Sequence, residues 1–496
     1  MKHFFYTAFV AVFLSGCGCA SQKSQDTVLS AEEISVFTSS DKTLEKSYSW
    51  AKKMALSYAH DGTDPVGLWY EAALPQREAF CMRDVSHQSV GAQILGLRAH
   101  NKNMFTRFAE NISEAKDWCS YWEINRYNQP APADYTNDKE FWYNLNANFD
   151  VMFACLKMYE WTGDKGYLTD SVFTNFYDKS LNKYLAHWEL DPDHLMNRPR
   201  YMHQPENFDV NNNFHTCRGL GSYVENFRGL TVGVDLVAAL YAGCKAHARI
   251  AELTGDKQTA ERDIQLARAY QNILEEQWWD DANSRYHTFW TEDRKFHRGE
   301  GIPFILWFEA TQNNQRLTAC VSDILSEKEK WNVENMSAFP LMFYRLGYDE
   351  EAYSYLATLP QMNRCEYPEV SYGVVEGVVS GMMGIVPSAS RKSLATCAHL
   401  TAETQEAEIK NVPVFDGYIT VKHKGNSETF IQNHTGQDLT WEASFKGNYP
   451  EIEVNGKTYP ATVREDCRNQ QISTVSVKLG EGKSLNAKAL PATADR

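Results

Sequence analysis

Apolar residues recur at the spacing of amphipathic helices from about residue 42 to residue 386. Two stretches differ, because they are apolar or small on nearly every side: one begins near Leu230, and the other runs from Tyr372 to Val386. Helices of that kind are expected in the interior of a fold. The segment 256–277 is amphipathic and is expected in an outer layer. The pattern therefore predicts two layers of helices, one inside the other.

Short connections rich in Gly or Asn join the helical patterns in pairs. Gly or Asn suits the left-handed residue that ends a helix, and a following Asp can cap the next helix. About twelve helices paired in this way are most simply arranged as an (α/α)6 toroid, with six inner helices inside six outer ones. An α-solenoid is the alternative, but its repeats have a near-constant length and these hairpins do not. The short connections lie near Asn101, Gly163, Gly255, Asn313 and Gly347.

Longer loops lie between the hairpins and are rich in Trp, Tyr, His, Arg and carboxylates. In a toroid the short turns line one rim, and the long loops gather on the other rim at the N-termini of the inner helices. Side chains from distant parts of the chain then meet in one bowl. The long loops are roughly 61–85, 120–146, 187–229, 280–300, 326–335 and 360–372.

The pattern changes after the last helix, where apolar and polar residues alternate with the period of β-strands. Asn455–Gly456 is typical of a hairpin turn. We expect a mainly α fold: an (α/α)6 catalytic toroid at 42–386, a linker at 387–411, and a small C-terminal β-sandwich domain at 412–496.

The N-terminus reads as an export signal. Lys2 and His3 precede an apolar run too short to span a bilayer, which ends in "LSGC", Leu14 to Cys17. This looks like a bacterial lipobox, so we expect a signal peptide at 1–17, a lipid on Cys17 and a polar tether at 18–41. An ordinary signal peptide is the alternative. The lipid would hold the protein on the cell envelope, at the outer membrane, facing the periplasm or the cell surface.

Composition narrows the class of partner. The net charge is −15, and no basic run or aromatic–basic patch suggests nucleic acid. The 13 Trp and 26 Tyr are a weak indication of flat ligands such as sugar rings. The 11 Cys are mostly scattered, without the spacing of metal ligands, so no metal and no cofactor is expected. We read most of them as small buried hydrophobic residues.

Arg83 and Asp84 stand at the entrance of the first expected inner helix, on the floor of the bowl. An Arg–Asp pair can form forked hydrogen bonds to adjacent hydroxyls of one sugar ring. Alternatively, Asp84 serves only as the N-cap of that helix and Arg83 as its ion-pair partner.

The segment 81–88, "CMRDVSHQ", resembles the Trp-x-Arg-Asp segment of glucoamylases and related six-hairpin glycosidases. The resemblance implies that this loop grips the terminal sugar. It also implies a general acid in loop 187–229 and a general base in loop 360–372. Cys81 stands where that family has Trp, so the wall of the sugar site is expected to differ.

Both loops carry carboxylates. We expect Glu225, just before an inner helix, to be the general acid, with Glu206 and Asp209 as alternatives in the same loop. Glu225 could instead be only a first-turn charge on that helix. Glu369 is expected to be the base that activates water. Glu300 could bind a sugar hydroxyl, act as the acid, or only cap its helix. By analogy with six-hairpin hydrolases, inversion of the anomeric centre is expected.

The expected bowl also concentrates cationic and hydroxyl donors, which suit a carboxylate-bearing sugar. The cations could equally neutralise carboxylates of the same loops. The chain is similar to the β-glucuronidases of glycoside hydrolase family 154 of Bacteroidetes, which implies a terminal β-linked glucuronic acid in an oligosaccharide or polysaccharide. Further residues expected to contact the sugar are His87, Trp142, Arg200, His203, His215, Arg218, Arg298 and Tyr372.

Two other functions fit the same residues. A polysaccharide lyase or unsaturated-uronide hydrolase on a related toroid would use a Tyr or His base, for which Tyr201, His203 and Tyr223 are available, and Asn226 could neutralise the uronate. A non-catalytic glycan-binding lipoprotein would use aromatic residues of the rim alone. The many carboxylates at the inner helices argue against the latter, because buried acids are costly without a task.

Overall fold

The computed structural model describes residues 29–74, 76–200, 202, 209, 216–225, 227 and 229–490. The expected signal peptide, the lipidation site Cys17 and part of the tether lie outside these residues. Within them, no helix is both long enough and apolar enough to cross a membrane.

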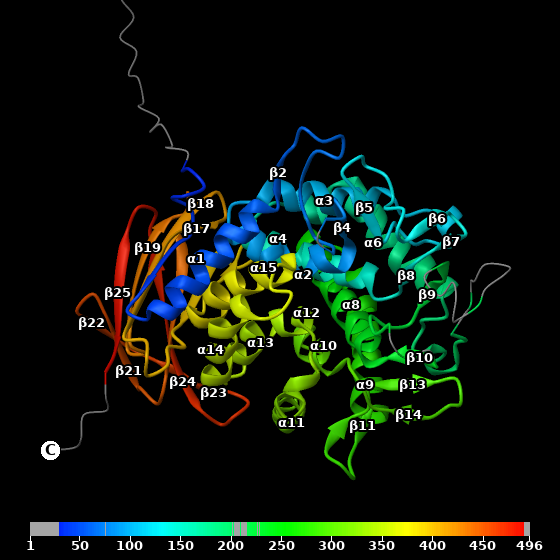
Figure 1. Cartoon of the computed structure of the whole chain (residues 1–496). Coiled ribbons are helices and arrows are strands. Elements are labelled where there is room, and N and C mark those ends of the chain that lie inside the picture. The colour runs from blue at the N-terminus through cyan, green and yellow to red at the C-terminus, as the bar shows by residue number, and fades with distance from the viewer. Residues whose placement is uncertain are drawn as a thin grey trace, which may run out of the picture.

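The described helices alternate along the chain between an outer and an inner position (Figure 1). The outer positions are filled by α1 (Lys42–Ser57), α3 (Arg98–Glu110), α5 to α7 (Gly166–Thr169, Ser171–Lys179 and Leu185–His187), α9 (Lys257–Gln277), α11 (Asn314–Ser326) and α14 (Asp349–Thr358). The inner positions are filled by α2 (Met82–Ile94), α4 (Ala147–Thr162), α8 (Val234–Thr254), α10 (Ile302–Trp307), α12 with α13 (Val333–Ser337 and Phe339–Arg345) and α15 (Pro368–Glu376), which continues as a π-helical segment, Gly377–Met382.

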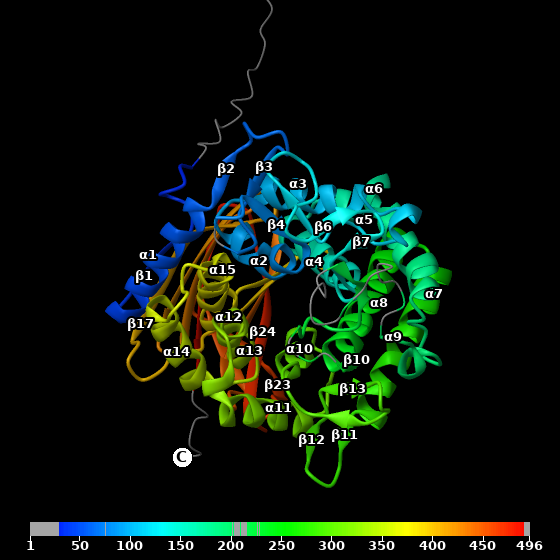
Figure 2. The same cartoon turned by 45° about the vertical axis from the view of Figure 1, so that its right-hand side comes forward.

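The helices close into a ring, because α15 packs against both α1 and α2. In Figure 2 the inner helices surround a common centre, with strands of the C-terminal domain behind them. The inner helices approach closely: a Cβ added at Gly91 in α2 would lie 2.4 Å from the carbonyl oxygen of Tyr372 in α15. The chain is therefore an (α/α)6 toroid, as predicted, and not an open solenoid.

Four of the five short connections lie where the sequence predicts them. Gly163, Gly255 and Gly347 have positive φ angles and end inner helices or their turns, and Asn313 caps α11. The prediction near Asn101 was wrong, because α3 already begins at Arg98. The left-handed residue of that turn is Gly96, with φ +84°.

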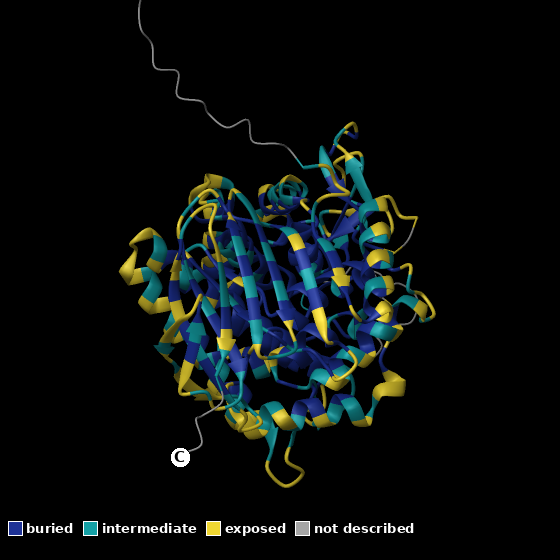
Figure 3. Cartoon of the chain, turned by 90° about the vertical axis from the view of Figure 1, so that its left-hand side faces the viewer, coloured by how far each residue is buried: buried dark blue, intermediate teal, exposed yellow. Residues whose placement is uncertain are grey.

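A β-sandwich lies beside the toroid, on the left in Figure 1. Apolar side chains of both its sheets belong to one core, and Figure 3 shows buried residues alternating with more exposed ones along the strands. The larger sheet has the order β1 (Val36–Ser39), β17 (Glu406–Val414), β18 (Gly417–Lys424), β19 (Glu428–His434), β25 (Ser484–Ala489), β21 (Glu451–Val454) and β22 (Lys457–Pro460). The smaller has the order β15 (Val386–Ser388), β16 (Ser393–Cys397), β20 (Leu439–Lys446), β24 (Gln471–Leu479) and β23 (Thr462–Glu465).

The expected boundaries of this domain need correction. The segment 387–411 is not a bare linker, because it supplies strands to both sheets. Part of the expected tether, Val36–Ser39, is strand β1 and pairs with β17. Strand β1 has only four residues and its partner β17 is distant along the chain, so local periodicity did not identify it as a strand.

The sandwich covers the rim formed by the short turns. The backbone N–H of Phe415 donates to the carbonyl oxygen of Trp161, near the end of inner helix α4. His399 Nδ1 lies 2.9 Å from Asp349 Oδ1 at the start of outer helix α14. One end of the ring is thereby closed, and the other end, with the long loops, stays open.

The nine described cysteines are all free, and six are buried.

Short strand pairs brace the long loops. The loop strands are β2 with β3 (Ala59–Asp61, Leu68–Tyr70), β4 with β5 (Ala79–Cys81, Glu123–Asn125), β6 with β7 (Tyr135–Asn137, Glu140–Phe141), β8 with β9 (Tyr143–Asn144, Arg218–Leu220), β10 with β13 and β14 (Leu230–Gly233, Phe289–Thr291, Phe296–His297) and β11 with β12 (Trp279–Asp280, Arg285–Tyr286).

Candidate active site

A cavity of about 460 Å³ lies among the long loops, at the N-terminal ends of the inner helices. The positive end of a helix dipole favours a carboxylate in the first turn. Five of the inner helices carry one there: Asp84 in α2, Asp150 in α4, Asp235 in α8, Glu334 in α12 and Glu369 in α15. The fold thus gathers acidic side chains at one place.

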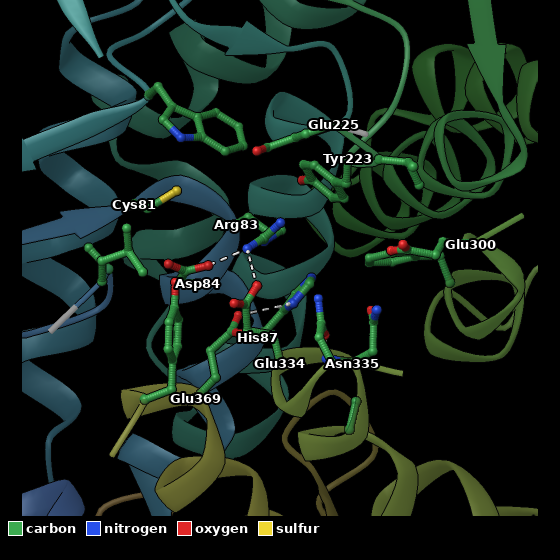
Figure 4. A pocket seen from close by; sticks show the side chains of 18 of the residues that line it. Cys81, Arg83, Asp84, His87, Tyr223, Glu225, Glu300, Glu334, Asn335 and Glu369 are labelled. Atoms are coloured by element: carbon green, nitrogen blue, oxygen red, sulfur yellow. Dashed lines mark hydrogen bonds and ion pairs between the residues drawn. The ribbon is translucent and has the colours of Figure 1, made fainter. Parts of the chain in front are cut away.

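The first cluster in the cavity is built around Arg83. Its guanidinium contacts Asp84 at 3.2 Å and Glu334 at 3.5 Å (Figure 4). Burial and the charge of Glu369 raise the pKa of Asp84 well above its usual range. Asp84 lies in the first turn of α2 and does not cap it, because the N-cap is Cys81. Asp84, Arg83 and Glu369 together form a polar wall of the cavity, in which Asp84 is hydrogen-bonded to Glu369.

Glu369 belongs to the same cluster and is held in the ionised form. His87 Nδ1 lies 3.7 Å from Glu369 Oε1, and His87 Nε2 lies 2.8 Å from Asp150 Oδ2. Burial opposes ionisation of Glu369, but the contact with His87 and the charge of Arg83 keep its pKa below the usual value. The two carboxylates around His87 raise the pKa of its imidazole despite burial. Glu369 can therefore accept a proton from water.

Glu225 and Glu300 reach the cavity from other walls, and Glu300 stands apart from the first cluster in Figure 4. Burial and the charge of Glu225 raise the pKa of Glu300. Burial and, to a lesser extent, the charges of Glu369 and Glu225 raise the pKa of Glu334. A carboxyl with a raised pKa is suited to donate a proton as a general acid.

Two local features hold these side chains. Asp235, at the start of α8, accepts hydrogen bonds from the Tyr223 backbone N–H at 2.6 Å and from the Ser222 hydroxyl at 2.8 Å, which fixes the loop that carries Glu225. Gly301 follows Glu300 with φ +120° and begins α10, so the chain turns sharply there.

A second cluster lines the same cavity. Arg77 Nη1 lies 2.7 Å from Glu123 Oε2 and 3.1 Å from Asp134 Oδ2. Burial and the contact with Asp134 raise the pKa of Glu123 to about 8. Glu123 therefore carries a proton at neutral pH, and the cavity holds a second arginine beside a protonated carboxyl.

The cationic side chains of the described lining are all engaged. Arg77, Arg83 and His87 each contact two carboxylates. Within the described residues, no group of three or more His, Cys, Asp or Glu side chains is placed to hold a metal ion. Each cation of the described lining is thus already paired with carboxyl groups.

A small cavity of about 20 Å³ lies behind Glu369 and His87. Glu376 and Gln88 line it from α15 and α2. Burial raises the pKa of Glu376. Glu376 is thus part of the support behind the base and does not line the main cavity.

Many residues selected from the sequence meet in the main cavity, including Arg83, Glu225 and Glu369, whose separation would have contradicted the prediction. Their chemical roles stay predictions. The selected residues that line it are Arg83, Asp84, His87, Trp142, Glu225, Glu300 and Glu369.

Other selected residues are placed elsewhere. Arg218 is buried, and its Nε donates to Asp117 Oδ2 at 2.7 Å. Tyr372 is buried and donates to the carbonyl oxygen of Ala55 at 2.9 Å. Both were wrong as sugar ligands, because each side chain is used inside the protein.

Three further expectations also fall outside the lining. Arg298 donates to the carbonyl oxygen of Tyr286 and contacts Asp323. Arg200 is buried, and neither it nor Asp209 lines the cavity. The cations that suggested a uronate are thus not in the described lining. Glu206, His203 and His215, with Tyr201 and Asn226 of the lyase interpretation, lie outside the described residues.

The sequence reasoning missed several residues of the site. Six of the seven lie in the long loops that it had marked, and Asp150 lies in the first turn of inner helix α4. The only signal was their position beside carboxylate-rich stretches. They are Arg77, Trp122, Glu123, Asp134, Asp150, Glu334 and Tyr367.

Neither a family model nor a curated protein matches this chain. Solved structures do. An α-L-rhamnosidase from Dictyoglumus thermophilum aligns at TM-score 0.60 with 12% identity, over 92% of this chain and 50% of that one. An α-L-rhamnosidase from Aspergillus terreus aligns at 0.56 with 11% identity, over 90% and 50%. A GH78 family rhamnosidase of Bacillus sp. GL1 aligns at 0.54 with 11% identity, over 80% and 40%.

These likenesses concern the fold. At such low identity they establish the toroid with its β domain and leave the chemistry to the residues of the site. The chain spans half or less of the length of each of these three proteins.

Proposed function

We propose that this protein is an exo-acting glycoside hydrolase that removes a terminal sugar by acid–base catalysis with two carboxyl groups. The observation that carries the proposal is that Glu369, whose pKa is lowered, shares one cavity with Glu300, whose pKa is raised, and with Glu225. Two carboxyls whose environments push their pKa values apart are what glycoside hydrolysis requires.

In the proposed reaction Glu369 takes a proton from a water molecule as that water attacks the anomeric carbon. A carboxyl on the facing wall protonates the leaving oxygen. Arg83 and Asp84 hold hydroxyls of the sugar ring. Glu300 fits the acid role by its raised pKa, and Glu225 is the alternative that the sequence favoured. We expect inversion by analogy with six-hairpin hydrolases, with the two carboxyls far enough apart to leave room for water.

The substrate expected from the sequence is a β-glucuronide. The described lining supports this only weakly, since each of its cations already contacts two carboxylates. Glycosides of neutral sugars are therefore tested as substrates on equal terms with glycosides of uronic acids. A lipid on Cys17 would place such an enzyme at the envelope, where glycans arrive from outside.

The lyase alternative gains no support from the described residues. Tyr223, one of its possible bases, donates a hydrogen bond to Asp150 Oδ2 at 3.1 Å. Burial and the charge of Asp150 raise the pKa of Tyr223 well above its usual range. A phenol with a raised pKa is a poor proton acceptor near neutral pH.

The test is an end-point screen of aryl glycosides of uronic and neutral sugars with the full chain. We expect release of one terminal sugar without an unsaturated product. We expect Glu369→Gln to lower kcat by about 10²–10⁴-fold, the usual contribution of a general base. Either Glu300→Gln or Glu225→Gln should cause a loss of similar size.

Glu366→Gln is the matched control, because Glu366 is exposed in the same loop and does not line the cavity. It should keep the activity of the unmodified protein. Full activity in Glu369→Gln, or an unsaturated product absorbing in the ultraviolet, would contradict the proposal.

A further inference from the structure

The Arg77 cluster repeats the chemistry of the Arg83 cluster in the same cavity. Each has one arginine between two carboxyls, at 3.2 and 3.5 Å for Arg83 and at 2.7 and 3.1 Å for Arg77. In each, one carboxyl is buried with a raised pKa, Asp84 in the first and Glu123 in the second. A guanidinium beside two carboxyls supplies both hydrogen-bond donors and acceptors, which is the set that vicinal sugar hydroxyls use.

The second cluster contains a buried polar atom without a hydrogen bond of its own. The Glu123 side chain is only 1% exposed; its carboxyl contacts Arg77 through Oε2 and is hydrogen-bonded to Asp134, but no hydrogen bond of its Oε1 is found among the described residues. Buried polar atoms nearly always find a partner, in the protein, in water or in a ligand. Since Glu123 lines the cavity, a molecule bound there can supply the missing bond.

The two clusters are neighbours in the fold. Cys81 and Glu123 are paired residues of strands β4 and β5, and Arg83 follows Cys81 by two positions. Cys81 itself lines the cavity, and its small side chain leaves the space between the clusters open. Tyr223 adds a wall, because Arg83 lies 5.5 Å from its ring centroid and Trp122 packs 6.1 Å from the same ring.

Exposure does not separate the clusters consistently. The Arg77 side chain is 33% exposed and that of Arg83 is 17% exposed, but Glu123 (1%) is less exposed than Asp84 (4%), and Asp134 (12%) less than Glu334 (19%). In the proposed exo-acting reaction the Arg83 cluster holds the terminal sugar, so a second sugar in the same cavity is on the leaving-group side. The cavity volume of about 460 Å³ falls within the range of sites that hold drug-sized ligands and exceeds what one sugar ring needs.

We propose that Arg77, Glu123 and Asp134 form a second sugar-binding subsite, which holds the sugar on the leaving-group side of the scissile bond. The preferred substrates are then oligosaccharides, at least two residues long, and not glycosides of simple alcohols. This inference rests on the proposed hydrolase function and names the substrate class of the same site.

The experiment compares kcat/KM for a disaccharide and for the aryl glycoside of the same terminal sugar, chosen from the screen. An aryl leaving group lacks the hydroxyls through which a second sugar would bind the Arg77 cluster. We expect Asp134→Asn to lower the ratio of the two kcat/KM values, disaccharide over aryl glycoside, about tenfold, the loss expected for one or two polar contacts. An equal effect on both substrates, or none, would overturn the subsite.

Glu78→Gln is the matched control. Glu78 immediately precedes β4, its carboxylate contacts Arg126 at 2.6 Å, and it does not line the cavity. The substitution Glu78→Gln removes a comparable ion pair from the same strand pair. It should leave the ratio of the two kcat/KM values unchanged.

A binding measurement separates failure of this subsite from failure of the proposed function. If the unmodified protein hydrolyses no glycoside, the proposed function fails. The subsite is then tested by direct binding, with the fluorescence of Trp122 and Trp142 as the signal. The protein is titrated with maltose, cellobiose, gentiobiose and xylobiose. Saturable binding of one of them, weakened about tenfold by Asp134→Asn but not by Glu78→Gln, supports the subsite. Binding that Asp134→Asn leaves unchanged, or no disaccharide bound more tightly than its monosaccharide, overturns it.

Discussion

Carboxyl groups that look alike in the sequence acquire different proton affinities from their neighbours. Glu369 faces His87 and Arg83, and its pKa is lowered, whereas Asp84, one position from the same arginine, has a raised pKa. Glu300 has no described ion-pair partner, and burial and the charge of Glu225 raise its pKa. The proposed division of labour between base and acid rests on these contacts.

His87 offers a test of that division. Replacing it with Asn removes the imidazolium that faces Glu369, so the pKa of Glu369 should rise. Because the base must be ionised, the acidic limb of the kcat/KM profile should move to higher pH, by about one unit. His60→Asn is the control, since His60 stacks on Trp69 outside the cavity. An unshifted acidic limb in His87→Asn would contradict the role given to His87.

Residue roles could be predicted from the sequence only in part. Glu369 was found because it directly precedes a helix that is apolar on every side. Glu123 and Asp150 were missed, since nothing local distinguishes them from solvated acids. Arg218 was misassigned because its partner Asp117 is 101 positions away. Pairing across such separations appears only in the folded chain.

The inner helices act as a scaffold that directs first-turn carboxylates to one end of the ring. Apolar, small-residue helices such as α8 and α15 pack closely enough for their N-termini to converge on the cavity. Periodicity predicted these helices well. It did not predict that α10 spans only six residues, Ile302–Trp307, or that strands precede α8.

Close packing of the inner helices predicts a severe effect of Gly91→Ala. A Cβ at this position would lie 2.4 Å from the carbonyl oxygen of Tyr372, so α2 and α15 would have to move apart. Although Ala is the better helix former, we expect a loss of about 1–3 kcal/mol in the free energy of unfolding, the usual cost of overpacking.

Urea unfolding measures this loss. Gly480→Ala is the control, because the nearest atom to its added Cβ is 3.4 Å away, at a flexible lysine side chain. Equal stability of the two variants would show that the inner helices are less tightly packed than described.

At the scale of the whole molecule, the sandwich closes the rim of short turns and leaves the rim of long loops open. His423 joins the two parts: its Nε2 donates to the carbonyl oxygen of Met383, after the last inner helix, at 3.0 Å, and its Nδ1 accepts from the Thr429 hydroxyl at 2.9 Å. Both bonds are made by the neutral ring. The overall plan was predictable from the sequence, but β1 was not, because its partner β17 lies at the other end of the chain.

Burial lowers the pKa of His423 to about 4, from a usual value near 6.5. Between pH 6.5 and 4, His423 therefore binds a proton in the unfolded chain but not in the folded chain. The free energy of unfolding decreases as the pH falls from about 6.5 to 4. The loss from this residue is at most about 3 kcal/mol. Unfolding by urea at pH 7 and pH 4.5 should show a smaller loss in His423→Gln than in the unmodified protein.

His434→Gln, a change at an exposed histidine of the same domain, is the control and should lose as much stability as the unmodified protein. The same loss in His423→Gln would mean that the acid sensitivity arises elsewhere.

The central claim is that carboxyls carried by distant parts of the chain act together on one glycosidic bond. The most direct test is kcat/KM for the best substrate of the screen in Glu369→Gln, in Glu300→Gln and in the double variant. Groups that act as a unit are not additive, so the double variant should be no worse than the poorer single variant within a few-fold. Losses that multiply, undiminished kcat/KM in Glu369→Gln, or undiminished kcat/KM in both Glu300→Gln and Glu225→Gln would contradict the account.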